Sequence, residues 1–179
     1  MASDAASRFW RHSIEIYGRP GVEAACLGLQ DRLRLDVNLL LLCCWAGAEG
    51  RRLSEDDMAW AIAAAADWQE QIVRPLRAAR RRLEIGFPGM PGETVEALRR
   101  RLGDIELECE RVEQMRLAAV VADHDTADPS ASVAIANLEI YLSRLGCRPA
   151  PPDCSDLRTL LMRCFPAAER TLIDAAFCD

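Results

Sequence analysis

The residues best suited to do chemistry in this sequence are eight arginines between positions 74 and 101. They are Arg74, Arg77, Arg80, Arg81, Arg82, Arg99, Arg100 and Arg101. A guanidinium group is planar, permanently charged and able to bind a carboxylate or a phosphate through two parallel hydrogen bonds. The window holds only three acids, so eight positive and three negative charges give it a net charge of +5 in a chain of formal net charge -6. The pattern predicts a local basic surface on an acidic protein.

Two interpretations of this basic window are open. In the first, Glu84, Glu93 and Glu96, with acids of neighbouring helices, pair with the arginines, and such exposed pairs contribute only about 0–1 kcal/mol each. In the second, the arginines bind an anion or a protein partner through a set of six: Arg74, Arg77, Arg80, Arg81, Arg99 and Arg100. An acidic protein is the favoured partner. Nucleic acid is less favoured because Phe87 is the one aromatic residue in the predicted turn, and single strands need stacking surfaces.

Patterns typical of catalysis or metal binding are missing from the sequence. Eight cysteines occur without any C-x-x-C spacing, and the two histidines, His12 and His124, lie outside zinc-ligand or Glu-x-x-His patterns. A nucleophile elbow and a glycine-rich phosphate loop are also absent. We therefore predict no catalytic residue, no metal site and no cofactor, with an enzyme as the less favoured alternative.

The cysteines divide into two groups. Cys26, Cys43, Cys44 and Cys109 lie in apolar helical patterns, where cysteine acts as a small hydrophobic residue. Cys147, Cys154, Cys164 and Cys178 gather near the end of the chain, where a redox or metal role stays open. A reducing compartment disfavours disulfides, so structural filling is the main prediction for all eight.

A second candidate site involves Asn38, Trp45 and Trp68. Asn38 interrupts a strongly apolar stretch, and a buried amide must find hydrogen-bond partners, which we expect in the backbone of a neighbouring helix. Trp45 and Trp68 are most simply core residues whose indole N–H needs an acceptor. The alternative is a small-molecule pocket, or an active site, within the helical bundle near these three residues.

The elements that position these residues are all predicted to be helices. Half of the residues are hydrophobic, and alanine, leucine, arginine and glutamate dominate. Apolar periodicity and capping residues predict helices over about 4–17, 21–33, 37–46, 55–84, 92–120, 130–145, 155–164 and 167–176. We expect residues 1–146 to form one helical bundle domain and residues 147–179 to form a short helical tail after a proline-rich linker.

The two longest predicted helices form an antiparallel hairpin around the turn at 86–92. Pro75 should kink the first of them, because proline cannot donate to the carbonyl one turn back. In the second, an apolar seam runs from Val95 to Val112 with alternating steps of three and four residues. With the turn centred near Pro88, residue i should face residue 177 − i, which places Arg77 near Arg100 and gathers the arginines at the hairpin tip.

Two blocks of the sequence resemble a family of uncharacterised bacterial proteins known only as a domain of unknown function. The first includes Phe9-Trp10, Tyr17, Cys26-Leu27-x-Leu29-Gln30 and Asp36-Val37-Asn38; the second includes Trp68, Val73-x-Pro75-Leu76-Arg77 and Arg80-Arg81. The resemblance covers roughly residues 9–83 and implies a helical protein without an assigned catalytic residue. Leu33-Arg34 departs from it, because a glycine is expected there.

The expected location is the cytoplasm. The longest apolar run, Val37 to Ala48, is about a dozen residues, whereas a membrane-spanning helix needs about 20, and the first residues lack the apolar segment of a signal peptide. Together these features predict an all-α, multi-helix bundle with a long antiparallel hairpin. We expect it to act as a non-enzymatic interaction or adaptor module.

Overall fold

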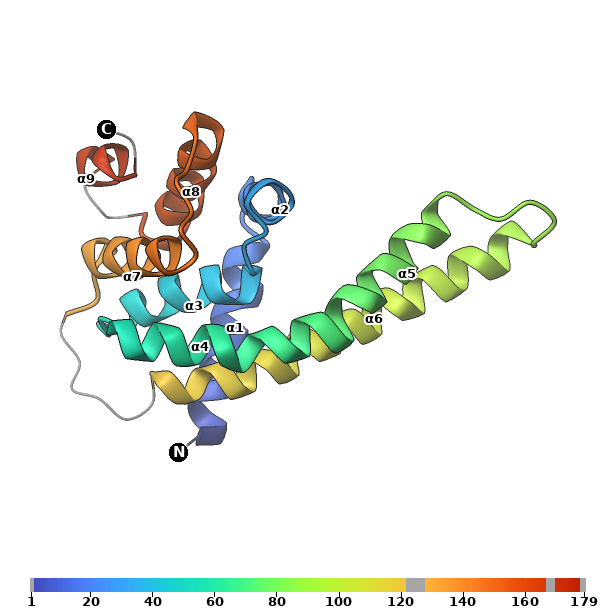
Figure 1. The fold of residues 1–179 in the computed structure, drawn as a ribbon, viewed down its shortest axis with the longest axis horizontal. Helices are drawn as coiled ribbons and strands as arrows, with labels where there is room; N and C mark the ends of the chain where they lie inside the picture. Colours follow the sequence, from blue (N-terminus) through green and yellow to red (C-terminus); the bar gives the residue numbers. More distant parts are fainter. Residues whose placement is uncertain (1, 122–127, 167–169, 178–179) are drawn as a thin grey trace.

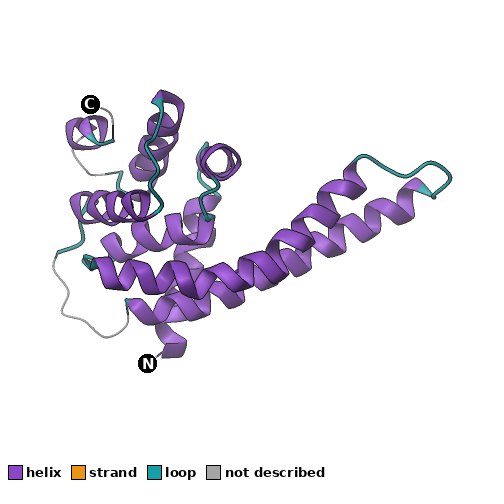
Figure 2. Ribbon diagram, in the orientation of Figure 1, coloured by secondary structure: helices purple, strands orange, loops and turns teal. Residues whose placement is uncertain are grey.

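The fold is entirely helical wherever the chain is described. The computed structural model describes residues 2–121, 128–166 and 170–177, and no strand occurs in these ranges (Figure 2). The α-helices are α1 (Ala2–Tyr17), α2 (Val22–Leu33), α3 (Val37–Ala48), α4 (Glu55–Trp68), α5 (Arg74–Glu84), α6 (Gly92–Leu117), α7 (Ala131–Arg144), α8 (Pro151–Cys164) and α9 (Arg170–Ala175). The predicted all-α class is therefore confirmed.

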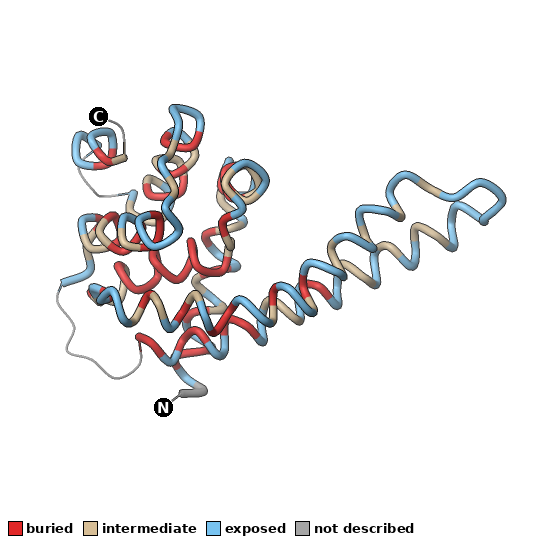
Figure 3. The backbone as a smooth tube through the Cα atoms, in the orientation of Figure 1, coloured by how far each residue is buried: buried red, intermediate tan, exposed pale blue. Residues whose placement is uncertain are grey.

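The molecule consists of a helical body and a projecting arm. Helix α5, the turn after it and the first half of α6 extend away from the remaining helices (Figure 1). Buried residues concentrate in the body, whereas the outer part of the arm is mostly exposed (Figure 3). The arm is the predicted antiparallel hairpin, and its packing against α1 and α2 decides where the arginines lie.

Helix α3 runs through the core of the body. Asp36 caps its first turn by accepting a hydrogen bond from the Asn38 amide at 2.8 Å, as a good N-cap residue should. All residues from 38 to 47 are buried, and Trp45 stacks on Phe9 with ring centroids 4.8 Å apart. The all-round apolar sequence of α3 therefore reflects contact with other helices on every side.

The first helix of the hairpin continues through a π-helical segment. Ser54 and Asp57 form a capping box at the start of α4. The segment Gln69–Val73 then winds as a π-helix and leads directly into α5, in which Pro75 lies in the first turn. The wider turn of this segment lies directly before Pro75 and accommodates its missing N–H, while the kink itself stays a prediction.

The predicted apolar seam of α6 is only partly buried, so this prediction is wrong in detail. Leu98, Ile105 and Val112 are each 45–49% exposed. The buried face of α6 carries Glu106, Glu113, Gln114 and Leu117 instead. Helix α6 is rotated relative to the predicted orientation. Its acidic and amide side chains face inward because they find hydrogen-bond partners on α5, the π-helical segment and α3.

The end of the chain packs on the body. Helix α8 lies against α2 and contributes Leu157, Leu160 and Leu161 to the core. Pro151 begins α8, so part of the expected proline-rich linker forms its first turn. The boundary at residue 146 stays a prediction, since packing alone does not tell whether residues 1–146 fold independently. Among the described residues, no helix is long and apolar enough to cross a membrane.

Candidate functional site

Arg77 lies opposite the acids of α6, and the predicted contact with Arg100 is wrong. Arg77 Nε is 2.7 Å from Glu106 Oε1, and Arg77 Nη2 is 2.6 Å from Glu110 Oε1. Side chains on a helix lean toward its N-terminus. Helix α5 begins at the body, whereas α6 begins at the turn. Arginines on α5 therefore lean toward the body, and glutamates on α6 lean toward the turn. Each arginine thus meets a glutamate that lies farther along α6 than symmetry about Pro88 predicts.

Glu106 joins two arginines of α5. Its side chain is 8% exposed and accepts from Arg77 Nε and Arg80 Nε, both at 2.7 Å. Burial acts to raise the pKa of Glu106, but the hydrogen bonds from Arg80 and Arg77 outweigh it and lower the pKa below its usual range. Arg99 binds Glu96 through two nitrogens at 2.7 and 2.8 Å. For Arg77, Arg80 and Arg99, internal pairing accounts for the charge.

The first cleft lies between α5 and the connection from α2 to α3. It has a volume of about 460 Å³, and its basic residues are Arg34, Arg74, Arg77 and Arg81. Arg74 makes an exposed pair with Glu70 at 3.2 Å, and Arg81 makes a long, exposed one with Asp31 at 3.4 Å. Such pairs exchange readily with solvent or with another anion.

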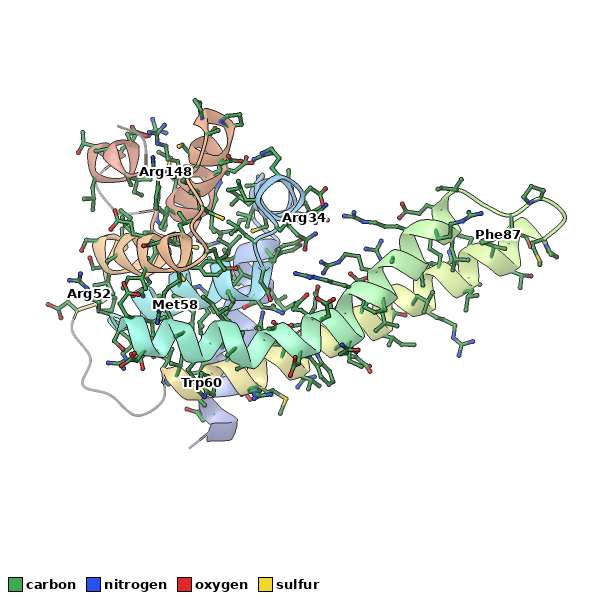
Figure 4. All side chains as sticks on the ribbon, in the orientation of Figure 1. Arg34, Arg52, Met58, Trp60, Phe87 and Arg148 are labelled. Carbon is green, nitrogen blue, oxygen red and sulfur yellow. The ribbon has the colours of Figure 1, made fainter. Side chains whose placement is uncertain are left out.

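Arg34 is a cleft residue that the arginine pattern missed. Its φ of 59° lies in the left-handed region, where it caps α2 by donating its amide to Gln30 O. A non-glycine residue pays about 1 kcal/mol for this conformation. Its side chain lies on the side of the body that faces the arm (Figure 4) and makes no ion pair with any residue the structure describes. The sequence signal was present, because Arg34 stands where the family resemblance expects glycine.

The second cleft lies on the α6 side of α5. It has a volume of about 550 Å³ and is lined by residues of α1, α2, α5 and α6, including Arg77, Arg80, Arg81, Arg99 and Arg100. All six predicted binding residues therefore line one cleft or the other. They lie mainly where the arm meets the body and not at its tip, where Arg82 instead covers the ring of Phe87 at 4.0 Å (Figure 4).

A smaller inner pocket of about 100 Å³ lies near Asn38. Asn38 Oδ1 accepts from Gln114 Nε2 at 2.8 Å, so its partner is a side chain and not the expected backbone. Trp45 and Trp68 lie elsewhere: Trp45 stacks on Phe9 in the core, and Trp68 donates to Cys109 O at 3.0 Å. Of the three predicted pocket residues, the structure places only Asn38 on this wall.

A buried acidic pair adjoins the inner pocket. Gln69 Nε2 donates to Glu113 Oε2 at 2.7 Å, and Asp36 lies beside Glu113. Burial, followed by the charge of Asp36, raises the pKa of Glu113 to about 9. Burial also raises the pKa of Glu110 to about 7, against the attraction of Arg77. At neutral pH Glu113 therefore holds a proton, so Asp36 and Glu113 together carry one negative charge.

The predictions for the two groups of cysteines are confirmed only in part. Cys26, Cys43 and Cys44 are buried in the core, as small hydrophobic residues should be. Cys164 lies beside Cys44 and His12, and hydrogen bonds from these two residues, Cys44 first, lower the pKa of the thiol to about 6. Cys154 is disulfide-bonded, so structural filling is wrong for this residue. Predictions for Cys178 and His124 fall outside the described residues.

Residues that carry the family resemblance surround these cavities. Those on the wall of the inner pocket are Trp10, Tyr17, Leu27, Gln30, Val37, Asn38 and Arg77. Comparison with curated proteins and with solved structures finds no match. A family profile described as "Protein of unknown function (DUF2390)" matches residues 8–117, a span that runs from α1 to the end of α6. Because this match covers more than half of the sequence, the chain belongs to that family.

Proposed function

We propose that this protein is a non-enzymatic adaptor that docks an acidic protein segment in the first cleft. The binding residues are Arg34, Arg74 and Arg81, which approach the same space from the end of α2 and from α5. Carboxylates of the partner are bound through guanidinium hydrogen bonds, with Gln30 and Gln69 as further polar wall residues.

The observation that carries this proposal is the state of Arg34. A strained, exposed arginine without a carboxylate partner among the described residues faces two arginines whose own pairs are exposed. The cleft holds four arginines against the two acids Asp31 and Asp36, so it keeps an excess of positive charge that suits an anionic partner. Strain kept in a surface residue is typical of a binding site.

The chemistry of the cleft favours an acidic peptide over RNA. Its walls hold no aromatic side chain among the described residues, so bases would find no stacking surface there. Arg100 lies in the second cleft and makes no ion pair with the described part of the chain. It can extend the binding surface toward the arm, whereas Arg77, Arg80 and Arg99 are held by Glu106, Glu110 and Glu96 and position the cleft.

The test is binding of a fluorescent oligoglutamate peptide at low and high salt. We expect the triple variant Arg34→Glu, Arg74→Glu, Arg81→Glu to lose at least about tenfold in affinity, since charged hydrogen bonds contribute about 1.5–3 kcal/mol each. A control triple variant, Arg52→Glu, Arg101→Glu, Arg148→Glu, changes the net charge equally at exposed sites outside both clefts.

Two results would contradict the proposal. One is equal loss of peptide binding in both triple variants, which would show an effect of net charge alone. The other is tighter binding of an oligouridylate strand than of oligoglutamate by the wild-type protein, which would favour RNA. Affinity capture from the native cytoplasm, with the same two variants as baits, then identifies the acidic partner.

A further inference from the structure

The inner pocket lies where five helices converge. Helices α1, α2, α3, α5 and α6 all contribute to its wall. Apolar and aromatic side chains form most of it, including Trp10, Leu27, Val37, Leu41 and Leu107. The wall residues with a short polar or amide side chain are Ser13, Gln30, Asn38 and Gln114, and the Arg77–Glu110 ion pair lies at one side. An apolar chamber with a few convergent polar groups is the usual form of a small-molecule site.

A chain of amide hydrogen bonds fixes one acceptor in this pocket. Asn38 Oδ1 accepts from Gln114 Nε2 at 2.8 Å. The amide of Gln114 is thereby oriented with its nitrogen toward Asn38. Its other end, Oε1, is buried and has no hydrogen-bond partner among the described residues, although Gln114 is only 2% exposed.

Ser13 supplies a second unsatisfied group on the same wall. The residue is 3% exposed, and its Oγ atom also lacks a hydrogen-bond partner within the described part of the chain. Leaving a buried polar group unpaired costs about 1–3 kcal/mol, so two such atoms beside one cavity indicate that something else completes their hydrogen bonds.

We propose that the inner pocket binds a small, uncharged ligand that carries an N–H or O–H donor on an apolar body. The donor bonds Gln114 Oε1, and Ser13 Oγ can donate to or accept from the same head group. The ligand is neutral because Arg77 on the wall is already paired with Glu106 and Glu110. A cavity of about 150 Å³ holds benzene, so one of about 100 Å³ suits roughly five non-hydrogen atoms.

The inner pocket adjoins the second cleft. Five residues line both cavities: Tyr17, Leu27, Arg77, Leu107 and Glu110. This site is independent of the proposed docking function, since Arg34, Arg74 and Arg81 do not line it.

The experiment compares two five-membered rings of nearly the same size. Pyrrole carries an N–H donor, and furan has an oxygen in its place. Binding to the full-length protein is measured by saturation-transfer NMR and by titration of protein amide signals. We expect pyrrole to bind about tenfold more tightly than furan, because only pyrrole satisfies Gln114 Oε1.

Two variants assign the preference to the pocket. Gln114→Met removes the acceptor with little change in volume, and we expect it to abolish the preference for pyrrole. Ser13→Ala removes only a hydroxyl group; it should leave pyrrole binding nearly unchanged, because Gln114 Oε1 takes the single N–H, and should weaken furan, whose oxygen accepts from Ser13 Oγ. It is also the safeguard if loss of the Asn38–Gln114 hydrogen bond unfolds the Met variant. The control is Ser155→Ala, an exposed serine outside the inner pocket.

The results separate the proposal from its alternatives. Equal binding of both rings would mean an apolar void without a functional donor site, and no binding of either would mean a space filled by water; each overturns the proposal. Loss of oligoglutamate binding without loss of pyrrole binding would instead contradict only the docking function.

Discussion

The ion pair between Arg77 and Glu106, with Nε and Oε1 2.7 Å apart, joins α5 to α6 at the point where three cavities meet. Arg77 lines the first cleft, the second cleft and the inner pocket. Its remaining nitrogens donate to Glu110 and Gln30, so one side chain links α2, α5 and α6. The base of the arm is therefore held by a buried network of charges, and the binding surfaces are arranged around it.

Replacing Arg77 should destabilise the fold more than replacing an exposed arginine. In Arg77→Met, Glu106 keeps Arg80 but Glu110 loses its partner, and loss of these part-buried charged hydrogen bonds should cost about 1.5–3 kcal/mol. Arg74→Met, which removes only the exposed pair with Glu70, should cost less than about 1 kcal/mol. Urea unfolding measures both, and similar values for the two variants would refute the central role of Arg77.

The stability of the wild-type protein should fall as the pH rises from about 5 to 9. The native state holds a proton on Glu113, whose pKa is about 9, whereas the unfolded chain releases it near 4.5. The native state thus binds more protons in this range, and the free energy of unfolding must decrease with pH. Glu110, with a pKa of about 7, acts in the same direction.

Glu113→Gln should remove much of this dependence. The amide keeps the acceptor for Gln69 but cannot ionise, so the variant should exceed the wild type at pH 9 by at least about 1 kcal/mol, with a smaller difference at pH 5. Glu93→Gln, at an exposed position, serves as the control. Urea unfolding across this pH range provides the comparison, and parallel curves for wild type and Glu113→Gln would show the assignment to be mistaken.

Arg34→Gly should separate stability from binding. Glycine adopts the left-handed conformation without penalty, so the variant should gain up to about 1 kcal/mol in stability. Loss of the guanidinium should at the same time weaken oligoglutamate binding. Arg34→Lys keeps the charge and the strain and should retain part of the binding. Thermal unfolding measures the change in stability, and peptide titration measures the change in binding. A glycine variant that is less stable than the wild type and binds oligoglutamate normally would contradict this prediction.

Gly47→Ala should loosen the packing of α3 on α7. A Cβ atom at this position would lie 2.6 Å from Ala134 Cβ and 2.7 Å from the Ala134 amide nitrogen, so the backbones must separate. Overpacking of this kind costs about 1–3 kcal/mol. At Gly92 an added Cβ meets nothing within 4 Å, so Gly92→Ala should change the free energy of unfolding little. If Gly47→Ala and Gly92→Ala changed the free energy of unfolding in urea equally, the close approach of α3 and α7 at Gly47 would be contradicted.

Local patterns were sufficient to predict the helices and the group of arginines. The cap at Ser54 and the turn after α5 depend on neighbours within a few residues, so the sequence shows them directly. The six predicted arginines do lie together around α5, because a helix and its antiparallel partner bring them there. The importance of Arg34 was visible only as a departure from an expected glycine.

Pairing of these arginines could not be read from the sequence. The partners of Arg77 are 29 and 33 residues away on α6 and 47 residues away on α2, and the lean of side chains on antiparallel helices selects them. The same holds for Gln114 and Asn38, 76 residues apart, whose hydrogen bond leaves an acceptor facing the inner pocket.

The helical class, most helix boundaries and the position of the positive charge along the chain follow from short-range propensity and periodicity. The rotation of α6, the division of the arginines into neutralised and available ones, and the inner pocket arise from the packing of distant segments. These depend on how distant polar groups satisfy one another when helices are buried together, and that balance has no signature in local spacing.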